Sequence, residues 1–252
     1  MQLKILCLNL YEGGLLWGNV ETLIQREKPD ILCLQEVFNG DERQPINFQS
    51  IKRLKTLLPD YFSYFSPELF EIFPQGQGDG GNAIYSRYPI SEEKTVFLHE
   101  EYRKILRPRR EDDFSHYPKN MQSVVVTVDG KKLNVFNMHG VWGLDGKEDS
   151  KERLRMSKLI CKEIKGKSPF VLMGDFNVQP NTKTIDAIEA YGTNVFKGVL
   201  QSTFNMEHKR NPGYATAVVD MIFASPDIQV TSKAAPEDDV SDHRPLLVTF
   251  NL

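Results

Sequence analysis

Two polar motifs in the C-terminal half of the chain carry groups that can hold a divalent cation and move a proton. Asp242 is followed directly by His243, and Asp175 stands two residues before Asn177 at the end of an apolar run. Residues two apart at a strand end can project to the same side, so Asp175 and Asn177 can together orient a water or a phosphate. Carboxylates bind Mg²⁺, and histidine exchanges protons near neutral pH. The alternative interpretation of Asp175 and Asn177 is a solvated turn.

Asn9 and Glu36 occupy the ends of two earlier strand-like runs, residues 3–10 and 30–35. A carboxylate that ends an apolar strand is costly unless it is solvated, paired or bound to metal. Asn9 taken alone is equally compatible with an edge or turn position, and Glu36 with a solvated or paired carboxylate. Taken with the two C-terminal motifs, they indicate metal-assisted cleavage of a phosphate ester.

His139 and Asp220 are two further candidates for chemistry. His139 ends the run 133–138 and is followed by Gly140, which allows a close backbone approach. Asp220 is embedded in an apolar run, so its charge needs a partner. An aspartate that accepts a hydrogen bond from one ring nitrogen of a histidine fixes the tautomer, and His243 is the predicted partner. The competing interpretations are a structural histidine and a structural ion pair.

The elements that must position these residues are short apolar strands alternating with helix-like stretches. The hydrophobic periodicity predicts helices over residues 20–28, 48–57 and 150–164. The predicted strands cover residues 3–10, 30–35, 82–86, 121–128, 132–138, 170–173, 218–224 and 246–250, and the stretches 67–81, 102–118 and 144–150 are expected to be loops. Asp129-Gly130 marks a hairpin, which favours mixed over all-parallel sheets. We expect an α/β fold in which two packed mixed sheets are flanked by helices.

Bulk properties indicate an ordinary globular protein. No linker or compositional break divides the 252 residues, so residues 1–252 are expected to form a single domain. The net charge of -3 argues against dependence on a wide basic surface. Three cysteines in apolar runs are expected to be buried, reduced thiols. No signal peptide or membrane-spanning run is evident, so we expect a cytoplasmic protein without membrane insertion, and no feature predicts a protein partner.

The ordered motifs resemble the endonuclease/exonuclease/phosphatase superfamily, which includes deoxyribonucleases, sphingomyelinases, inositol-polyphosphate 5-phosphatases and tyrosyl-DNA phosphodiesterases. The matching segments, in family order, are Leu8-Asn9, Leu34-Gln35-Glu36-Val37, Asn137-Met138-His139, Gly174-Asp175-Phe176-Asn177, Val219-Asp220-Met221-Ile222 and Ser241-Asp242-His243. They extend over almost the whole chain. The resemblance implies a four-layer α/β sandwich and divalent-metal hydrolysis of phosphate esters.

The resemblance also implies residue roles. Glu36 and Asn9 would bind Mg²⁺, for which Mn²⁺ is a possible substitute, and Asp242 would complete the metal environment. Catalysis would be shared by His139, Asp175, Asn177, Asp220 and His243. Within this set Asp175 and Asn177 would position the attacking water, and Asp220 would orient His243 for acid/base chemistry. His139 would stabilise the transition state or assist the leaving group. Abasic-site endonucleases carry asparagine at the position of His139, so the chain sits closer to the other subfamilies.

The substrate is the least constrained feature. Arg103, Arg107 and Arg109, in the loop 102–118, are candidates to grip a phosphate, although a solvated, self-paired loop explains them equally well. Arg153 is a further candidate to reach back towards the site. We expect a phosphodiesterase acting on nucleic acid or a nucleic-acid adduct. The alternatives are hydrolysis of a small-molecule or lipid phosphate ester and, in another class, a binding module without turnover.

Overall fold

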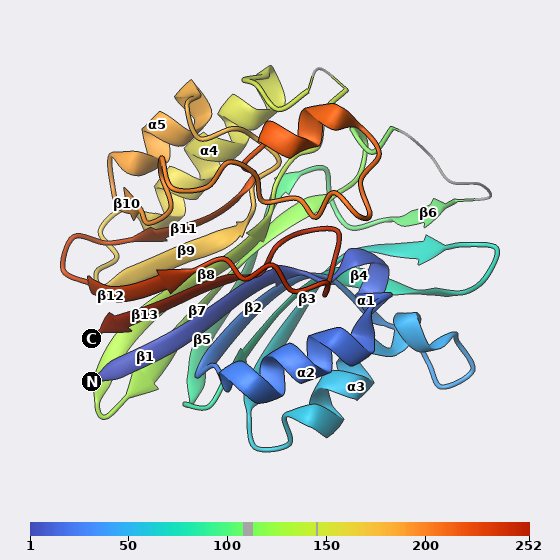
Figure 1. The fold of residues 1–252 in the computed structure, drawn as a ribbon, viewed down its shortest axis with the longest axis horizontal. Coiled ribbons are helices and arrows are strands. Elements are labelled where there is room, and N and C mark those ends of the chain that lie inside the picture. The colour runs from blue at the N-terminus through green and yellow to red at the C-terminus, as the bar shows by residue number, and fades with distance from the viewer. Residues whose placement is uncertain (108–112, 145) are drawn as a thin grey trace.

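The computed structural model describes residues 1–107, 113–144 and 146–252 and contains two β-sheets packed face to face. Within the described residues, seven strands form one sheet in the order β12-β13-β1-β2-β4-β3-β6, and six form the other in the order β10-β11-β9-β8-β7-β5. Figure 1 shows helices α2 and α3 covering the outer face of the first sheet and α4 and α5 covering that of the second. The predicted four-layer α/β sandwich is confirmed.

The element bounds follow the hydrophobic runs of the sequence. The first sheet contains β1 (Gln2–Asn9), β2 (Ile31–Asn39), β3 (Phe62–Ile72), β4 (Gln77–Ser86), β6 (Lys104–Leu106), β12 (Gln229–Ala234) and β13 (Leu246–Asn251). The second contains β5 (Ile90–His99), β7 (Lys119–Val128), β8 (Lys131–His139), β9 (Phe170–Asp175), β10 (Thr193–Asn194) and β11 (Asp220–Ala224). The helices are α1 (Tyr11–Gly14), α2 (Trp17–Glu27), α3 (Ser50–Leu57), α4 (Lys151–Ile164) and α5 (Lys183–Glu189), with 3₁₀ turns η1 (Ile46–Gln49) and η2 (Pro212–Thr216).

Strand β1 illustrates why the central runs are apolar without interruption. Leu3, Ile5 and Cys7 point into the core between the two sheets. Leu6 and Leu8 point to the other face and pack with the residues of α2 and α3. Because both faces of such a strand are buried, it shows no alternation of apolar and polar residues. The middle of each sheet is therefore rigid, and the strand ends can hold polar side chains in fixed positions.

Three local predictions were wrong. The expected loop 67–81 is mostly strand, because β3 and β4 form an antiparallel hairpin that includes it. Glycines in this stretch signalled a loop, yet Gly81 serves a close strand contact: a Cβ there would lie 2.1 Å from the carbonyl oxygen of Ser66. The segment 102–118 contributes the short strand β6. Cys161 is only half-buried on α4, unlike Cys7 and Cys33.

No helix among the described residues is long and apolar enough to span a bilayer.

Candidate active site

The polar residues predicted from the strand ends meet at one end of the second sheet. His139, the last residue of β8, lies beside Asp175 of β9 in parallel register. Asp175 faces Asp220 across the antiparallel β9–β11 pair. Neighbouring strands lie about 5 Å apart, so three strands bring these side chains together without help from any loop.

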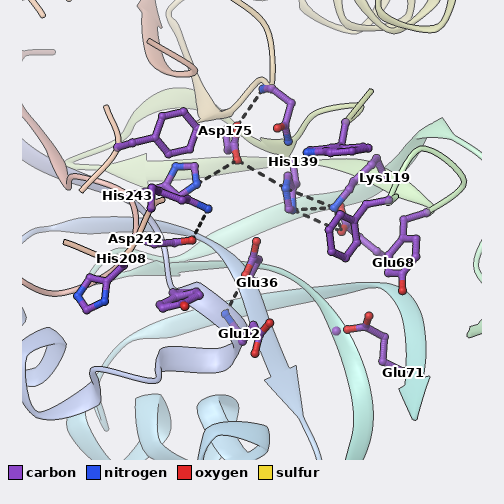
Figure 2. Close-up of a pocket in the computed structure, with 18 of the residues that line it drawn as sticks. Glu12, Glu36, Glu68, Glu71, Lys119, His139, Asp175, His208, Asp242 and His243 are labelled. Carbon is purple, nitrogen blue, oxygen red and sulfur yellow. Dashed lines mark hydrogen bonds and ion pairs between the residues drawn. The ribbon is translucent and has the colours of Figure 1, made fainter. Parts of the chain in front are cut away.

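The first sheet contributes to the same site because hydrogen bonds connect the end of β1 to the loop before β13. The Ser241 hydroxyl donates to the carbonyl oxygen of Asn9 at 2.6 Å and accepts from the backbone N–H of His243 at 3.1 Å. This places Asp242 and His243 against the end of β1. The resulting cleft has a volume of about 690 Å³, and Figure 2 shows Glu36, His139, Asp175, Asp242 and His243 facing into it.

The side chains of Asp220 and His243 are in contact, the pairing that the sequence analysis expected. The two side chains are almost fully buried, and Nδ1 of His243 lies 2.8 Å from Oδ2 of Asp220. The other ring nitrogen, Nε2, lies 3.8 Å from Oδ2 of Asp175. Burial by itself lowers the pKa of His243, but the negative charges of Asp220, Asp175 and Asp242 outweigh it and raise that pKa to about 9. His243 therefore carries a proton at neutral pH in this environment.

Glu36 and Asn9 lie together at the edge of the first sheet, where the Asn9 amide turns its N–H2 group towards the carboxylates and its Oδ1 accepts from the backbone N–H of Tyr11 at 3.1 Å. The Asn9 amide donates to Oε1 of Glu36 at 3.0 Å, and the backbone N–H of Glu12 donates to Oε2 at 2.8 Å. Glu36 itself has a positive φ of 54°, a conformation that costs about 1 kcal/mol or more for a non-glycine residue. The strand predicted to end at residue 35 continues to Asn39, and Glu36 lies where the β2–β4 register shifts between Leu34 and Val37. At this irregularity the carboxylate turns towards the cleft. Asp242, the third predicted ligand, lies 2.5 Å from the ammonium nitrogen of Lys209.

The donor chemistry of this end of the cleft fits a hard divalent cation. Glu36, Asp175 and Asp242 supply carboxylate oxygens, the ligand type that Mg²⁺ prefers. Among the described residues, ligand atoms of Asp175, Asp220 and His243 also lie within 4.8 Å of one another. In that group Asp220 is engaged by His243, so we regard it as a carboxylate that orients the ring. Both groups border the same cleft, and the cluster is compatible with a divalent metal.

His139 has partners that the sequence analysis did not find. The Lys119 ammonium lies 3.0 Å from Nδ1 of His139 and 3.4 Å from Oε2 of Glu68. Burial lowers the pKa of His139 well below its usual value, and the positive charge of Lys119 lowers it further. His139 is therefore neutral where His243 is protonated. Its other ring nitrogen lies 3.7 Å from Oδ2 of Asp175.

Glu68 is buried within a network of hydrogen bonds. Its Oε1 accepts from the Asn82 amide at 3.1 Å and from the backbone N–H of Asn120 at 3.0 Å. Burial raises the pKa of this carboxyl group, and Lys119 partly offsets that rise. The only sequence signal was a glutamate inside a stretch that resembled a loop, where a solvated charge is the ordinary expectation.

Asp175 and Asn177 adopt a tight turn after β9. The backbone N–H of Asn177 donates to Oδ1 of Asp175 at 2.8 Å, and Asn177 has a positive φ of 55°. The Lys147 ammonium donates to the Asn177 amide oxygen at 2.7 Å. Burial raises the pKa of Asp175. Lys147 and Lys209 come from loops and were not predicted; a lysine in a polar loop gives no sequence signal that it turns inward.

The three arginines predicted to bind substrate differ in placement. Arg107 is buried against Glu71 at 3.3 Å and borders the cleft. Arg103 is exposed and ion-paired with Glu100 at 3.3 Å, and it is not among the residues that line the described cleft. Arg109 lies outside the described residues. Arg153 does not reach the reacting groups but binds the backbone of the loop that precedes its own helix.

A family model described as the endonuclease/exonuclease/phosphatase family matches residues 13–243. The chain belongs to this family. A curated relative, the UPF0294 protein of Vibrio campbellii (strain ATCC BAA-1116), is 29% identical over 123 residues, which are 49% of this chain and 41% of that protein. The match therefore spans less than half the length of this relative.

Solved structures share the fold of this chain. The endonuclease/exonuclease/phosphatase protein from Bacteroides vulgatus has a TM-score of 0.75 at 20% identity, covering 100% of this chain and 99% of that one. The mannosyl-6-phosphatase Bt3783 from Bacteroides thetaiotaomicron VPI-5482 has a TM-score of 0.69 at 21% identity, covering 99% and 100%. D. rerio TDP2 complexed with a single-strand DNA product has a TM-score of 0.72 at 17% identity, covering 100% and 99%. At these identities the similarity establishes the fold alone.

Proposed function

We propose that this protein is a divalent-metal-dependent phosphodiesterase that acts on nucleic acid or a nucleic-acid adduct. The observation that carries the proposal is the pair of histidines, held in opposite protonation states on either side of Asp175. Its Oδ2 lies 3.7 Å from Nε2 of His139 and 3.8 Å from Nε2 of His243. Environments that separate the pKa values of neighbouring groups are typical of acid/base catalysis. Members of the family are hydrolases of phosphate esters, which agrees with this arrangement.

Glu36 and Asp242 would hold the metal ion, whereas Asn9, predicted as a further ligand, turns its amide N–H towards Glu36 and would orient that carboxylate. When bound, a divalent cation supplies Lewis-acid stabilisation of charge on phosphorus-bound oxygens. Mg²⁺ keeps several of its waters and needs only one or two protein carboxylates, so this small ligand set is sufficient. Mn²⁺, which accepts the same oxygen donors, is expected to substitute.

The remaining steps of the reaction would be carried out by side chains of the cleft. Asp175, whose carboxylate is fixed by the Asn177 N–H, would orient and deprotonate the attacking water. His243, protonated and oriented by Asp220, would donate at Nε2 to an oxygen that becomes more negative in the transition state. His139, which is neutral and lies beside Lys119, would stabilise the transition state or assist the leaving group. All of these residues are present, which argues against a scaffold that has lost turnover.

Aromatic side chains at the other end of the cleft favour a nucleic-acid substrate. Phe114, Tyr117 and Trp142 line it and form edge-to-face pairs with ring centroids 5.3 and 5.6 Å apart. Lys209 and Arg210 border the cleft as well. Aromatic rings that stack on bases, with cations for the backbone, are the recurrent means of binding single strands. The structural neighbour TDP2, solved with a single-strand DNA product, is consistent with this proposal.

A phosphatase acting on a small phosphate ester is the second candidate. Its support is the neighbour described as a mannosyl-6-phosphatase, which aligns over its full length. A labelled oligonucleotide panel, bis-p-nitrophenyl phosphate and p-nitrophenyl phosphate, each with Mg²⁺ or Mn²⁺, distinguish the two. We expect cleavage of the diesters that is lost with EDTA and in Asp175→Ala. Release from the monoester alone would support the phosphatase instead.

Near-wild-type rates in folded Glu36→Ala, Asp175→Ala and His243→Ala would contradict both assignments, since each should lose at least roughly a hundredfold.

A further inference from the structure

The loop between β8 and α4 is fixed to the body of the protein by Arg153. This side chain is fully buried. Its guanidinium donates to the carbonyl oxygens of Val141 at 3.2 Å, Gly146 at 2.7 Å and Glu148 at 2.6 Å. An arginine presents five donors in a rigid fork, so one buried residue fixes the backbone at both ends of this loop.

A second set of contacts fixes the loop from the side of β9 and α5. The carbonyl oxygen of Lys147 accepts from the backbone N–H of Gln179 at 2.7 Å. The Asp149 carboxylate accepts from the backbone N–H groups of Lys183 and Thr184, each at 2.9 Å. The backbone around Lys147 is therefore hydrogen-bonded to α4, through Arg153, and to α5. This fixes the position from which the Lys147 side chain enters the cleft.

The Lys147 side chain is half-buried at the wall of the cleft. Its ammonium lies 5.8 Å from the ring centroids of both Phe204 and Tyr214. Among the described residues it forms no ion pair within 4.0 Å; its hydrogen-bond acceptor is the Asn177 amide oxygen at 2.7 Å. Burial lowers the pKa of Lys147 to about 8. Partly desolvating a lysine against a neutral amide contributes less to folding than an ion pair would, so the position has another explanation.

The Asn177 amide supplies that reason. Its Oδ1 is occupied by Lys147, and one of its two Nδ2–H groups donates to the carbonyl oxygen of Gly140 at 3.2 Å. An amide has two donors on nitrogen and an acceptor on oxygen. With the oxygen occupied, the group left to meet a phosphate oxygen is an N–H. The reversed amide would instead direct its carbonyl oxygen at the anion and repel it.

We propose that Lys147 is a positioning residue that fixes the Asn177 amide with its N–H side towards the substrate phosphate. The catalytic consequence rests on the proposed function, whereas the fixed orientation of the amide does not. Lys147 acts through Asn177 and makes no direct contribution to the reacting atoms. Arg153 holds the loop from which Lys147 acts.

The test combines NMR of the Asn177 side chain with a double-mutant cycle. Lys147→Met keeps the length of the side chain and removes the donor. Lys158→Met, on the exposed face of α4, is the matched control. The Asn177 side-chain amide signal is identified by its loss in Asn177→Ala. We expect this signal to shift and broaden in Lys147→Met and to stay unchanged in Lys158→Met, with all variants folded by circular dichroism.

In turnover of bis-p-nitrophenyl phosphate, we expect Lys147→Met to lose about ten- to hundredfold in kcat/KM, the scale of one hydrogen bond from a charged donor. Asn177→Ala and the double variant should have the same kcat/KM, because the lysine has nothing left to position. Lys147→Arg, which retains a cationic donor, should recover part of the loss.

An unchanged Asn177 signal in Lys147→Met would overturn the proposal whatever the activity. Multiplicative losses in the double variant would also overturn it, since Lys147 would then act independently of Asn177. If the wild type cleaves no phosphate ester, the proposed function fails, and the NMR comparison still decides whether Lys147 fixes the amide.

Discussion

Replacing Asp220 by Asn tests the acid/base assignment most directly. Asp220 and His243 are 2% and 4% exposed, so solvent screens their interaction little. The substitution keeps the shape of the side chain and removes the charge that Nδ1 of His243 meets at 2.8 Å. Without that charge, the pKa of His243 should fall towards its usual 6.5, because burial is then opposed only by Asp175 and Asp242.

The size of the effect follows from the pKa. Raising the pKa of His243 from 6.5 to about 9 corresponds to roughly 3 kcal/mol of preference for the protonated ring. At pH 8 the wild-type ring is mostly protonated, whereas a ring with a pKa at or below 6.5 is protonated in about 3% of molecules. If His243 works as a proton donor, kcat/KM at pH 8 should fall by up to roughly thirtyfold as the pKa returns towards 6.5, with a further loss because the ring is less well oriented.

The assay is kcat/KM for bis-p-nitrophenyl phosphate from pH 5.5 to pH 10. We expect the wild type to lose activity as pH rises through about 9 and Asp220→Asn to lose it at a clearly lower pH, by up to about two pH units. The free energy of unfolding should also decrease at high pH. The raised pKa of His243 contributes stability that is complete below pH 6.5 and lost as pH rises through 9. Asp186→Asn, on the exposed face of α5, is the control. An alkaline limb in the same place for wild type and Asp220→Asn would refute the reasoning.

Three further predictions concern the metal, a buried ion pair and one glycine. EDTA should abolish turnover, and Mg²⁺ or Mn²⁺ in excess should restore it in the same sample; activity that persists in EDTA would exclude a metal requirement. Burial raises the pKa of Glu71 to about 7 despite Arg107, so the wild type should lose stability relative to Glu71→Gln as pH rises from 4.5 through 7, by up to about 3 kcal/mol in urea denaturation. A pH-independent difference would contradict this. A Cβ at Gly174, where φ is 146°, would lie 1.9 Å from the Met138 carbonyl oxygen, so Gly174→Ala should cost about 3 kcal/mol, whereas Gly18→Ala in open space on α2 should not destabilise.

The strand-end residues could be predicted because their physical cost is visible in the sequence. A charge inside an apolar run, such as Asp220, must have a partner, and the sequence offers few candidates. The strands that carry His139 and Asp175 bury apolar residues on both faces, which gives them mostly apolar sequences. Their order in the sheet then follows from parallel and hairpin pairing, so the meeting of these residues is a consequence of topology.

Glu68 and Lys119 could not be predicted for the opposite reason. The β3–β4 register shifts between Pro67 and Leu69, and Glu68 lies at that irregularity. A shift of one residue moves a side chain to the other face of a sheet, and nothing local in the sequence specifies it. Lys119 begins a buried strand, a position where a lysine ordinarily reaches solvent. Here the site depends on tertiary packing.

The same unpredicted pair explains why two histidines near one aspartate behave differently. His139 faces the Lys119 ammonium at 3.0 Å, whereas His243 faces the Asp220 carboxylate at 2.8 Å. Burial penalises the charged form of both rings, and only His243 has a negative partner that overcomes it. Side-chain ¹⁵N NMR of the metal-free protein at pH 7 should therefore show a protonated His243 and a neutral His139, and Lys119→Met should raise the pKa of His139 without moving that of His243. Equal protonation of the two rings in the wild type would remove the asymmetry on which the assignment of a donor and a neutral group depends.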